Sequence, residues 1–383
     1  MFLRWCCFAC ISLLVGLRVE VANAQFYRKV GDKKLPHWSI VVDPSGHGNF
    51  STIQSAIDSV PSDNKYWVSI KVKAGTYREK VNIPSDKPYI ILKGEGKRRT
   101  FVEWDDHNTT SQSPTFAAMA DNIVVKSMSF RVRIFLFLFV VQKIVLGIVT
   151  LFINKNKNIL SWVEFLIIKF VYVEQNSYNN PINSKPKVAA VAAKISGDKS
   201  YFFRVGFFGF QDTLWDDTGR HYYKLCTIQG SIDFIFGAGQ SLFELLWQRC
   251  SISVIGGALD MDLPGFITAQ GRINPEDANG FVFKECHVFG NGSAYLGRPW
   301  RNYARVLFYK TNMTNVVQPR GWDAWHFSEH EDRVTFAEYA NFGPGSDTSK
   351  RVNWTKMLDL KTMETMTSTT FIDTEGWLQH QPF

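Results

Sequence analysis

The chain has few charged residues for its length and no run of charges of one sign. Charged residues make up 20% of its 383 residues, whereas 45% are hydrophobic and 15% are aromatic. This composition excludes a disordered chain and a coiled coil. The net charge of +8 is diffuse and comes without a basic helix or cluster, so we expect no nucleic-acid partner. Diffuse positive charge suits retention on an acidic polymer, and equally a solvated basic surface.

Cysteine is also scarce. Three of the six cysteines lie in residues 1–24, where Arg4 precedes an apolar run and Ala22 and Ala24 fit a small-x-small cleavage site. We expect residues 1–24 to be a secretory signal peptide and residues 25–383 to form the secreted chain. Five Asn-x-Ser/Thr sequons fit a glycoprotein of the secretory route. They begin at Asn49, Asn108, Asn291, Asn312 and Asn353.

The cysteines of the expected mature chain are Cys226, Cys250 and Cys286. Three cysteines allow at most one intrachain bridge and exclude a disulfide-dense scaffold. The expected mature chain has no Cys-x-x-Cys pair and no histidine cluster, so we expect no metal site. We interpret the three thiols as core side chains.

Helical periodicity is nearly absent. One short stretch, Ser51 to Val60, places Ile53, Ala56 and Ile57 on a single helical face and predicts a short N-terminal helix. From Trp67 to the region near residue 315, short β-rich runs alternate with Gly, Asn and Asp, which is typical of strands joined by turns.

A repeat recurs through the second half of the chain: an aromatic residue, a small residue three positions later, and an apolar residue two positions further on. Its copies are Phe203/Gly206/Phe208, Tyr223/Cys226/Ile228, Trp247/Cys250/Ile252, Phe283/Cys286/Val288 and Phe308/Thr311/Met313. Short strands at such spacing predict an all-β fold, a parallel β-helix whose coils stack so that equivalent residues form interior ladders.

One segment, residues 131–174, breaks this pattern. It consists mainly of Phe, Ile, Leu, Val, Lys and Asn and has hardly any turn residues. A membrane span fits the length of residues 134–153, but Lys143 near the middle would cost about 2.5 to 3.5 kcal/mol, and we expect no stable span. A hydrophobic hairpin or helix packed on the domain is the second interpretation. Translated non-coding sequence, such as a retained intron, is the third and the one we favour.

Two aspartates stand in apolar surroundings one coil apart. Asp212 follows Gln211 in GFQDTLWDD, and Asp233 lies in GSIDFIFG, 21 residues later. A β-helix would stack these carboxylates side by side. Two carboxylates in an aromatic setting have pKa values that move apart, one staying ionised and one protonated near neutrality. A pair of turn aspartates without chemistry is the plain alternative.

A third element, YLGRPW, contains Arg298 and Trp300. A guanidinium in this apolar, sharply turned segment can pair with one carboxylate and keep it charged. Trp300 offers a flat face on which a sugar ring can stack, although burial in a core is the commoner fate of a tryptophan.

Together the motifs resemble those of the plant pectin methylesterases, the pectinesterase family of right-handed parallel β-helix enzymes. The resemblance runs from about Trp38 to Trp377, interrupted by residues 131–174, and indicates the form without an inhibitor-like helical pro-region. It rests on five motifs in the same order: GTYREKV (75–81), GFQDTLWDD (209–217), GSIDFIFG (230–237), ITAQGR (267–272) and YLGRPW (295–300).

The resemblance implies an aspartyl esterase without cofactors that releases methanol from galacturonate methyl esters. Asp233 would attack the ester carbonyl, and Asp212 would first protonate the departing methanol and then act as the base for water. Gln211 would donate to the oxyanion. Arg298 would hold Asp233 ionised and, with Trp300, contact the sugar. Thr115, in a Thr-Phe that matches the family, would be a further substrate contact.

The resemblance also implies a cellular location and binding partners. We expect a secreted, monomeric enzyme of the plant cell wall that acts on methyl-esterified homogalacturonan and can meet a proteinaceous inhibitor. At one position the chain departs from the family: where many members have a glutamine that opens Gln-Ala-Val-Ala-Leu, a second oxyanion donor, this chain has Ala189. Losing such a donor can cost about two to three orders of magnitude in rate.

Two other functions stay open at this stage. A polygalacturonase or pectate lyase would cut the polymer, and a lyase usually holds calcium on several carboxylates, a cluster that the sequence lacks. A wall protein that binds pectin with weak or no turnover is the second alternative. Methanol release without new reducing ends distinguishes the esterase from both.

Overall fold

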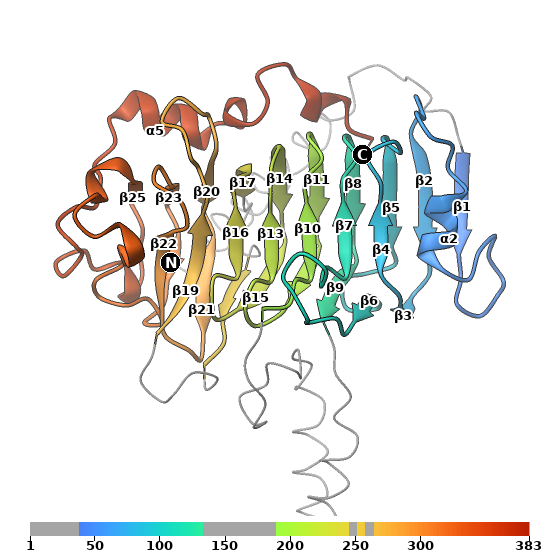
Figure 1. The fold of residues 1–383 in the computed structure, drawn as a ribbon, viewed down its shortest axis with the longest axis horizontal. Helices are drawn as coiled ribbons and strands as arrows, with labels where there is room; N and C mark the ends of the chain where they lie inside the picture. The colour runs from blue at the N-terminus through green and yellow to red at the C-terminus, as the bar shows by residue number, and fades with distance from the viewer. Residues whose placement is uncertain (1–37, 133–188, 245–250, 257–263, 383) are drawn as a thin grey trace, which may run out of the picture. The chain divides into compact units, whose positions relative to one another are not determined.

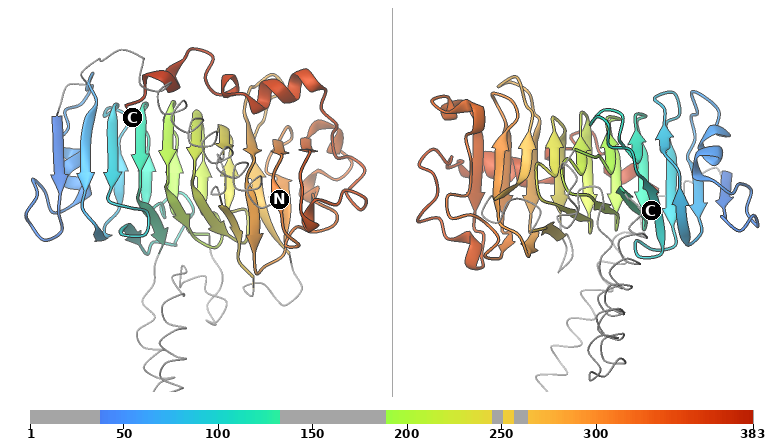
Figure 2. Two further views of the ribbon diagram at one scale, coloured as in Figure 1. Left: turned by 180° about the vertical axis from the view of Figure 1, so that it is seen from behind. Right: turned by 60° about the horizontal axis from the view of Figure 1, so that its bottom comes forward.

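The computed structural model describes residues 38–132, 189–244, 251–256 and 264–382. The expected signal peptide, Cys250, Trp247 and most of the segment 131–174 lie outside the described residues. The described chain winds into a right-handed parallel β-helix with three parallel sheets, and a complete coil contributes one strand to each sheet (Figures 1 and 2). The predicted fold class is confirmed.

The ten-stranded sheet runs the length of the β-helix and follows every coil. Its strands, in order, are β1 (Trp38–Val42), β2 (Val68–Val72), β5 (Ile90–Gly94), β8 (Ile123–Lys126), β11 (Ser200–Phe203), β14 (Arg220–Lys224), β17 (Gln240–Glu244), β20 (Gly280–Lys284), β23 (Arg305–Tyr309) and β25 (Thr335–Tyr339).

The other two sheets contain shorter strands. The eight-stranded sheet holds β3 (Gly75–Arg78), β6 (Thr100–Trp104), β9 (Ser129–Val132), β12 (Gly206–Phe208), β15 (Thr227–Gly230), β18 (Ser251–Val254), β21 (His287–Gly290) and β24 (Asn312–Met313). The seven-stranded sheet holds β4 (Val81–Ile83), β7 (Phe116–Ala118), β10 (Ala193–Ile195), β13 (Leu214–Asp216), β16 (Ile235–Gly237), β19 (Gly265–Gln270) and β22 (Ala294–Pro299).

Helices lie at the ends and along the C-terminal part of the chain. They are α2 (Ile53–Asp58), α5 (Leu360–Thr367) and the 3₁₀ turns η1 (Trp325–Phe327), η2 (Glu331–Arg333), η3 (Pro344–Ser346), η4 (Thr369–Phe371) and η5 (Trp377–His380). Within the described residues, no helix is long and apolar enough to cross a membrane.

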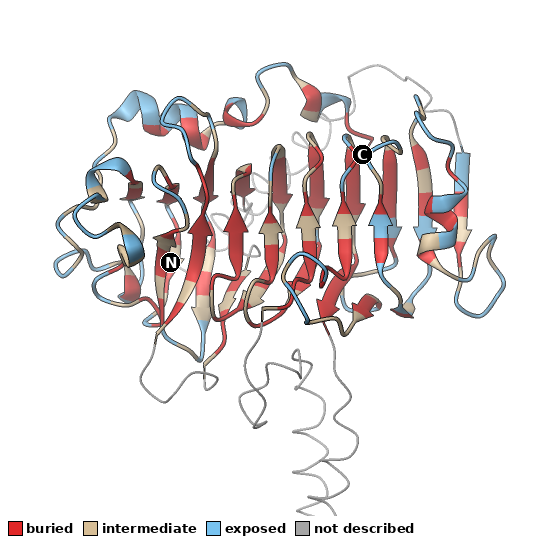
Figure 3. Cartoon of the chain, in the orientation of Figure 1, coloured by how far each residue is buried: buried red, intermediate tan, exposed pale blue. Residues whose placement is uncertain are grey.

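The predicted N-terminal helix is confirmed as α2. Thr52 caps its start, and the carboxylate of Glu79 accepts from the backbone N–H groups of Ile53 and Gln54, each at 2.8 Å. These acceptors satisfy amide groups that a helix start leaves without intrahelical partners. Lys87 donates to three carbonyls near the other end. The buried face of α2 covers the first coils, and the interior of the sheets is buried throughout (Figure 3).

An aromatic column fills the interior along the ten-stranded sheet. Neighbouring rings are nearly parallel, with centroids 4.9, 4.5, 4.6 and 4.5 Å apart. Its members are Phe202, Tyr223, Phe243, Phe283 and Phe308, which pair in register. The predicted ladder is therefore right in kind but wrong at one copy, where the ring in register is Phe202 and not Phe203. Phe243 stands in register between Tyr223 and Phe283, whereas the predicted Trp247 lies outside the described residues.

The cysteines follow the ladder prediction where the structure describes them. Cys226 and Cys286 are buried in the main core, and the pairing of β15, β18, β21 and β24 places Cys286 one coil before Thr311. The core interpretation of these two residues is confirmed.

A polar cluster is enclosed inside the coil next to the column. His221 is fully buried, with Nδ1 3.1 Å from a carboxylate oxygen of Asp216 and Nε2 3.0 Å from the carbonyl oxygen of Gly197. Tyr223 and Ser241 each donate to the other oxygen of Asp216 at 2.7 Å. Because both ring nitrogens of His221 face acceptors, both must carry hydrogen, and the imidazole is a cation. Burial lowers the pKa of His221, but Asp216 outweighs this effect and the net shift is upward.

Residues 131 and 132 belong to the β-helix and not to the atypical segment. Both lie in β9 and are buried; Arg131 donates to Glu103 at 2.8 Å, and its guanidinium lies 4.2 Å from the ring centroid of Phe101. The predicted start of the segment at 131 is therefore too early. Strands on the two sides pair directly, β7 with β10 and β9 with β12, so the stacking of the coils continues in register across residues 133–188.

Candidate active site

Asp212 and Asp233 occupy the same position in successive coils. Gln211 forms a parallel bridge with Ile232, and the backbone N–H of Asp212 donates to the carbonyl of Ile232 at 3.1 Å. Each aspartate lies at the turn that leads into the seven-stranded sheet, just before β13 or β16. Both have a left-handed backbone, with φ of 58° and 45°, which aspartate tolerates better than most residues. The predicted juxtaposition agrees with this register.

Arg298 reaches Asp233 from β22, two strands further along the same sheet. Its Nε donates to one carboxylate oxygen at 2.8 Å and its Nη2 to the other at 2.5 Å. The side chains of Arg298 and Asp233 are only 16% and 12% exposed. A bidentate pair of this kind fixes the carboxylate and gains strength from exclusion of water.

Two aromatic rings flank the guanidinium of Arg298. The rings of Phe266 and Trp325 each have their centroid 4.0 Å from its central carbon. Such rings lower the cost of burying a cation. The sequence analysis missed both. Phe266 is an ordinary strand residue in the sequence, and Trp325 lies in an irregular segment with no strand pattern, where its backbone is left-handed with φ of 48°.

The two carboxyl groups have different electrostatic surroundings. Burial, followed by the charge of Asp233, raises the pKa of Asp212 to about 7, against the opposing effects of the Thr110 hydroxyl, 3.3 Å from Oδ2, and the charge of Arg298. Burial also raises the pKa of Asp233, and the net shift is upward although the hydrogen bonds and charge of Arg298 lower it. Asp212 therefore has a proton to give near neutrality, and Asp233 has a cation that stabilises its charged form.

Gln211 and Ala189 lie at the same turn. Gln211 is half-buried and directly precedes Asp212, and its carbonyl accepts from the N–H of Ala190 at 3.2 Å. Ala190 is fully buried against Val132 and Ala192, whereas Ala189 is only half-buried. Of these two alanines, only Ala189 lies where a longer side chain has room.

An outward-facing row of residues crosses the seven-stranded sheet beside the aspartates. Pairing places Lys194, Trp215, Phe236, Ala269 and Arg298 at one level on successive strands. Trp215 and Phe236 stack with centroids 5.3 Å apart, and the ammonium of Lys194 lies 4.0 Å from the Trp215 ring centroid. Phe236 and Ala269 are buried in this row, so its accessible aromatic surface is that of half-buried Trp215, with a cation at each end of the row.

Trp300 extends this surface. It is half-buried and meets Phe236 edge-to-face at 5.9 Å, while the guanidinium of Arg301 lies 4.5 Å from its ring centroid. A Cβ at Gly271 would come within 2.8 Å of the indole, which explains the glycine of ITAQGR. Trp300 therefore has both a packing role and an accessible part.

Thr115 does not lie where the resemblance placed it. It is fully buried, and its hydroxyl donates to the carbonyl of Arg131 at 3.3 Å. Its N–H donates to Val191 and its carbonyl accepts from Val81. With no exposed atom to offer, Thr115 holds neighbouring coils together, and a direct contact with a substrate is not supported.

The described residues contain no group of three or more His, Cys, Asp or Glu side chains that could hold a metal ion. The side chains gathered at the site supply one carboxylate held by a guanidinium, a second carboxyl that titrates near neutrality, and a neighbouring amide. These are the parts of a covalent acyl transfer followed by hydrolysis.

Comparison with known proteins gives consistent results. A family model named Pectinesterase matches residues 39–134 and 169–375. Two proteins of Arabidopsis thaliana are similar: "Probable pectinesterase 29" is 49% identical over 347 residues, covering 90% of this chain and 89% of that protein. "Probable pectinesterase 55" is 48% identical over 358 residues, covering 91% and 94%. The solved structure of "Pectin methylesterase from Carrot" superposes with a TM-score of 0.70 at 26% identity, covering 93% of this chain and 99% of that one.

Proposed function

Because the chain belongs to the pectinesterase family and hydrolyses the methyl esters of pectin, we propose that Asp233 is the nucleophile and Asp212 the general acid and base of this reaction. The chain-cleaving alternatives are not favoured by any of the relatives. One observation carries the assignment: the two aspartates lie in register on adjacent coils, yet only Asp233 is held by a guanidinium through two hydrogen bonds.

In the first half of the reaction, a carboxylate oxygen of Asp233 attacks the ester carbonyl of a galacturonate unit. The carbonyl oxygen becomes an oxyanion, to which the side-chain amide of Gln211 donates. The methoxy oxygen leaves as the C–O bond breaks, and it takes the proton of Asp212. Methanol departs, and the acyl group stays on Asp233 as an anhydride. A pKa of about 7 for Asp212 suits this donation near neutrality.

In the second half, Asp212 is ionised and accepts a proton from water. The hydroxide adds to the acyl carbonyl, the bond to Asp233 breaks, and the galacturonic acid leaves and gives its proton to solvent. Both carboxyl groups return to their initial protonation states. Arg298 keeps Asp233 a good leaving group because it stabilises the carboxylate that is released.

Substrate binding follows from the aromatic surface of the seven-stranded sheet. Trp300 and Arg298 contact the sugar, and Trp325 forms the wall that keeps Arg298 aimed at Asp233. We also propose secretion to the plant cell wall, where pectin is found. Among the sequons, Asn49, Asn108, Asn291 and Asn353 are exposed, whereas Asn312 is half-buried in β24. The monomeric state and the proteinaceous inhibitor stay predictions.

The test is methanol release from methyl-esterified pectin by the purified chain, with reducing ends counted in parallel. Asp233→Asn should abolish methanol release with an unchanged circular dichroism spectrum, because an amide is isosteric with the carboxylate but not nucleophilic. Arg298→Ala should be similarly damaging near neutrality, because the pKa of Asp233 then rises further. Activity of Asp233→Asn near that of the wild type would refute the assignment, and a wild-type chain that binds pectin without releasing methanol would be a binding protein.

A matched control lies outside the site. Asp198 also receives a bidentate arginine, Arg220, at 3.0 and 2.5 Å, but at the turn on the other side of the seven-stranded sheet. Asp198→Asn should leave methanol release near the wild-type value. Equal losses in Asp198→Asn and Asp233→Asn would mean that both variants act through folding.

A further inference from the structure

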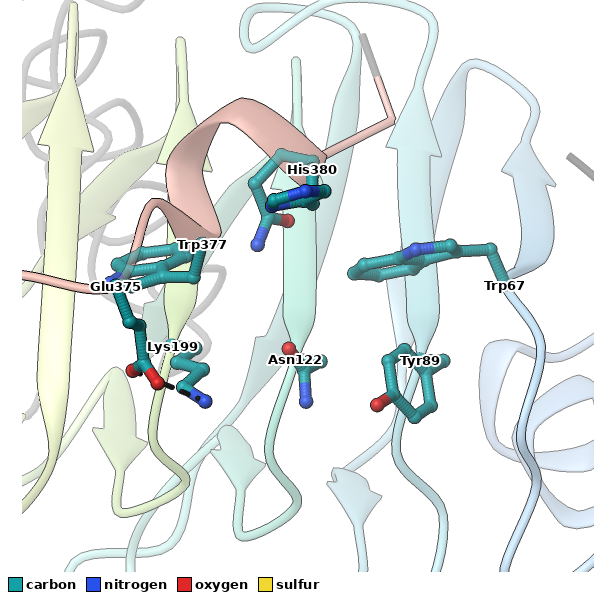
Figure 4. A pocket seen from close by; sticks show the side chains of 8 residues that line it. Trp67, Tyr89, Asn122, Lys199, Glu375, Trp377 and His380 are labelled. Carbon is teal, nitrogen blue, oxygen red and sulfur yellow. Dashed lines mark ion pairs between the residues drawn. The ribbon is translucent and has the colours of Figure 1, made fainter. Parts of the chain in front are cut away.

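A second pocket lies at the other edge of the seven-stranded sheet from the aspartates. It has a volume of about 270 Å³ and opens where the chain turns into the ten-stranded sheet. Tyr89, Asn122 and Lys199 come from successive coils at this turn, all with left-handed backbone (φ 60°, 57° and 58°). In Figure 4 their side chains form a row, and the C-terminal turn η5 lies above it.

The C-terminal segment that covers this row is firmly attached. Glu375 pairs with Arg220 at 2.7 Å and with Lys199 at 3.3 Å. The indole N–H of Trp377 donates to Ile372 at 2.7 Å, and Lys126 donates to the carbonyl of Pro382 at 2.6 Å. The pocket is thus a preformed feature of a fixed segment, as small-molecule sites usually are.

The walls of the pocket combine aromatic and polar groups. Trp67 is half-buried and meets Tyr89 edge-to-face at 5.4 Å, while the indole of Trp377 closes the opposite side (Figure 4). Asn122 and Lys199 supply donors and an acceptor between these rings. Rings that offer a flat apolar face beside amide and charged groups match the two sides of a sugar ring, which has C–H faces and a polar rim.

One buried atom at the lining of the pocket lacks a partner. Gln381 is 6% exposed, and its side-chain Oε1 is buried and has no hydrogen-bond partner among the described residues. Groups of this kind call for an explanation. Because solvent does not reach this oxygen in the unliganded chain, a ligand hydroxyl satisfies it only after the amide of Gln381 turns toward the pocket.

We propose that this pocket is a second saccharide site that holds one galacturonate unit of de-esterified pectin. The volume lies just below the usual range for ligand pockets and fits one sugar-sized unit. A sugar hydroxyl donates to Gln381 once its amide turns toward the pocket, and the ring stacks on Trp67. Lys199 faces the carboxylate on the side away from Glu375, which also lines the pocket and takes only one of its donors. The choice of a uronate over a neutral sugar rests on the proposed function, since a uronate is the product released at Asp233.

The experiment uses the full chain and a de-esterified oligogalacturonide, with neutral galactan as the comparison ligand. Hydrogen exchange resolved by peptide distinguishes binding at this pocket from binding at the site around Asp233. The oligogalacturonide should slow exchange in residues 377–382 and around Trp67. In Trp67→Ala and Gln381→Leu this protection should disappear, and the apparent Kd for polygalacturonan should rise by about tenfold or more.

The melting temperature of the unliganded variant distinguishes a ligand-binding role of Gln381 from a packing role. Gln381→Leu removes the acceptor that has no partner, so the unliganded variant should melt at the wild-type temperature or higher while losing the protection. Tyr66→Ala is the matched control: Tyr66 is 66% exposed next to Trp67 but does not line the pocket, and its removal should leave binding intact.

Methanol release from a short methyl-esterified oligomer should stay at the wild-type rate in all three variants, which separates this test from that of Asp233. Protection in residues 377–382 that persists in both pocket variants would overturn the proposal. Equal protection by neutral galactan would overturn the assignment of a uronate.

Discussion

Replacing Asp212 with asparagine should make the protein more stable, increasingly so as the pH rises. In the folded chain the pKa of Asp212 is raised from 3.8 to about 7. A group whose pKa is raised on folding favours the folded state at low pH and loses that advantage as the pH rises through the folded value. Ionisation of Asp212 therefore lowers the free energy of unfolding, and this loss is absent below about pH 4 and complete above about pH 7.

The size of the effect follows from the shift. The difference between about 7 and 3.8 is roughly 3 pKa units, and at 1.36 kcal/mol per unit this is up to about 4 kcal/mol. Asparagine has no such cost, and its carbonyl can still accept from Thr110. The free energy of unfolding of Asp212→Asn should equal that of the wild type near pH 4 and exceed it by up to about 4 kcal/mol near pH 8.

The same substitution should remove activity, because an amide cannot give a proton to methanol. We expect methanol release to fall by about two to four orders of magnitude. Denaturant unfolding at several pH values measures the first effect, and methanol release the second. Asp212→Asn in an Asp233→Asn background provides the control: with the charge of Asp233 gone, the pH-dependent gain should shrink. A gain of the same size at pH 4 and pH 8, or a loss, would refute the reasoning.

Three further predictions concern other parts of the chain. Ala189→Gln should raise the rate constant for methanol release by up to about two orders of magnitude with little change in KM; no change, or a change in KM alone, would mean that position 189 does not face the reacting carbonyl. In unfolding experiments, His221→Gln should be less stable than the wild type below about pH 6.5, and the gap should close as the pH rises through the raised pKa of His221; a gap that widens with pH would contradict an imidazolium there. Deleting residues 135–168, which the family model leaves unmatched, should raise the yield of soluble secreted protein, because an apolar run is an aggregation liability and the flanking strands already pair. A lower yield or melting temperature would make that segment part of the fold.

The position of Asp212 beside Asp233 could be predicted from the sequence, because no loop is inserted in the coil that connects them. Their spacing of 21 residues is one uninterrupted coil, so the linear distance gives the register. The same reasoning failed for the aromatic ladder. Phe202 and Phe203 are both aromatic, and the sequence alone does not show which of the two rings points inward. The pairing of strands decides this in favour of Phe202.

Other parts of the site depend on contacts that the sequence does not encode locally. Trp325 flanks Arg298 from an irregular segment, so no periodicity points to it. Thr115 looked accessible because its motif matches the family, yet its hydroxyl is used by Arg131. Burial of a short polar side chain depends on the coil above and below, which only the three-dimensional stack supplies.

The stacking of coils also determines how the catalytic parts depend on the rest of the molecule. In a solenoid each coil contacts only its neighbours, so stability is transmitted step by step, as in a one-dimensional chain of coupled units. Asp212 and Asp233 lie just before β13 and β16, which are interior to the seven-stranded sheet, whereas Arg298 lies on β22, the last strand of that sheet. Melting that begins at the N-terminal end must pass through several coils before it reaches a catalytic residue, but melting that begins at the C-terminal end reaches Arg298 early. Enzymatic activity therefore tolerates fraying of the first coils and is sensitive to fraying of the last ones.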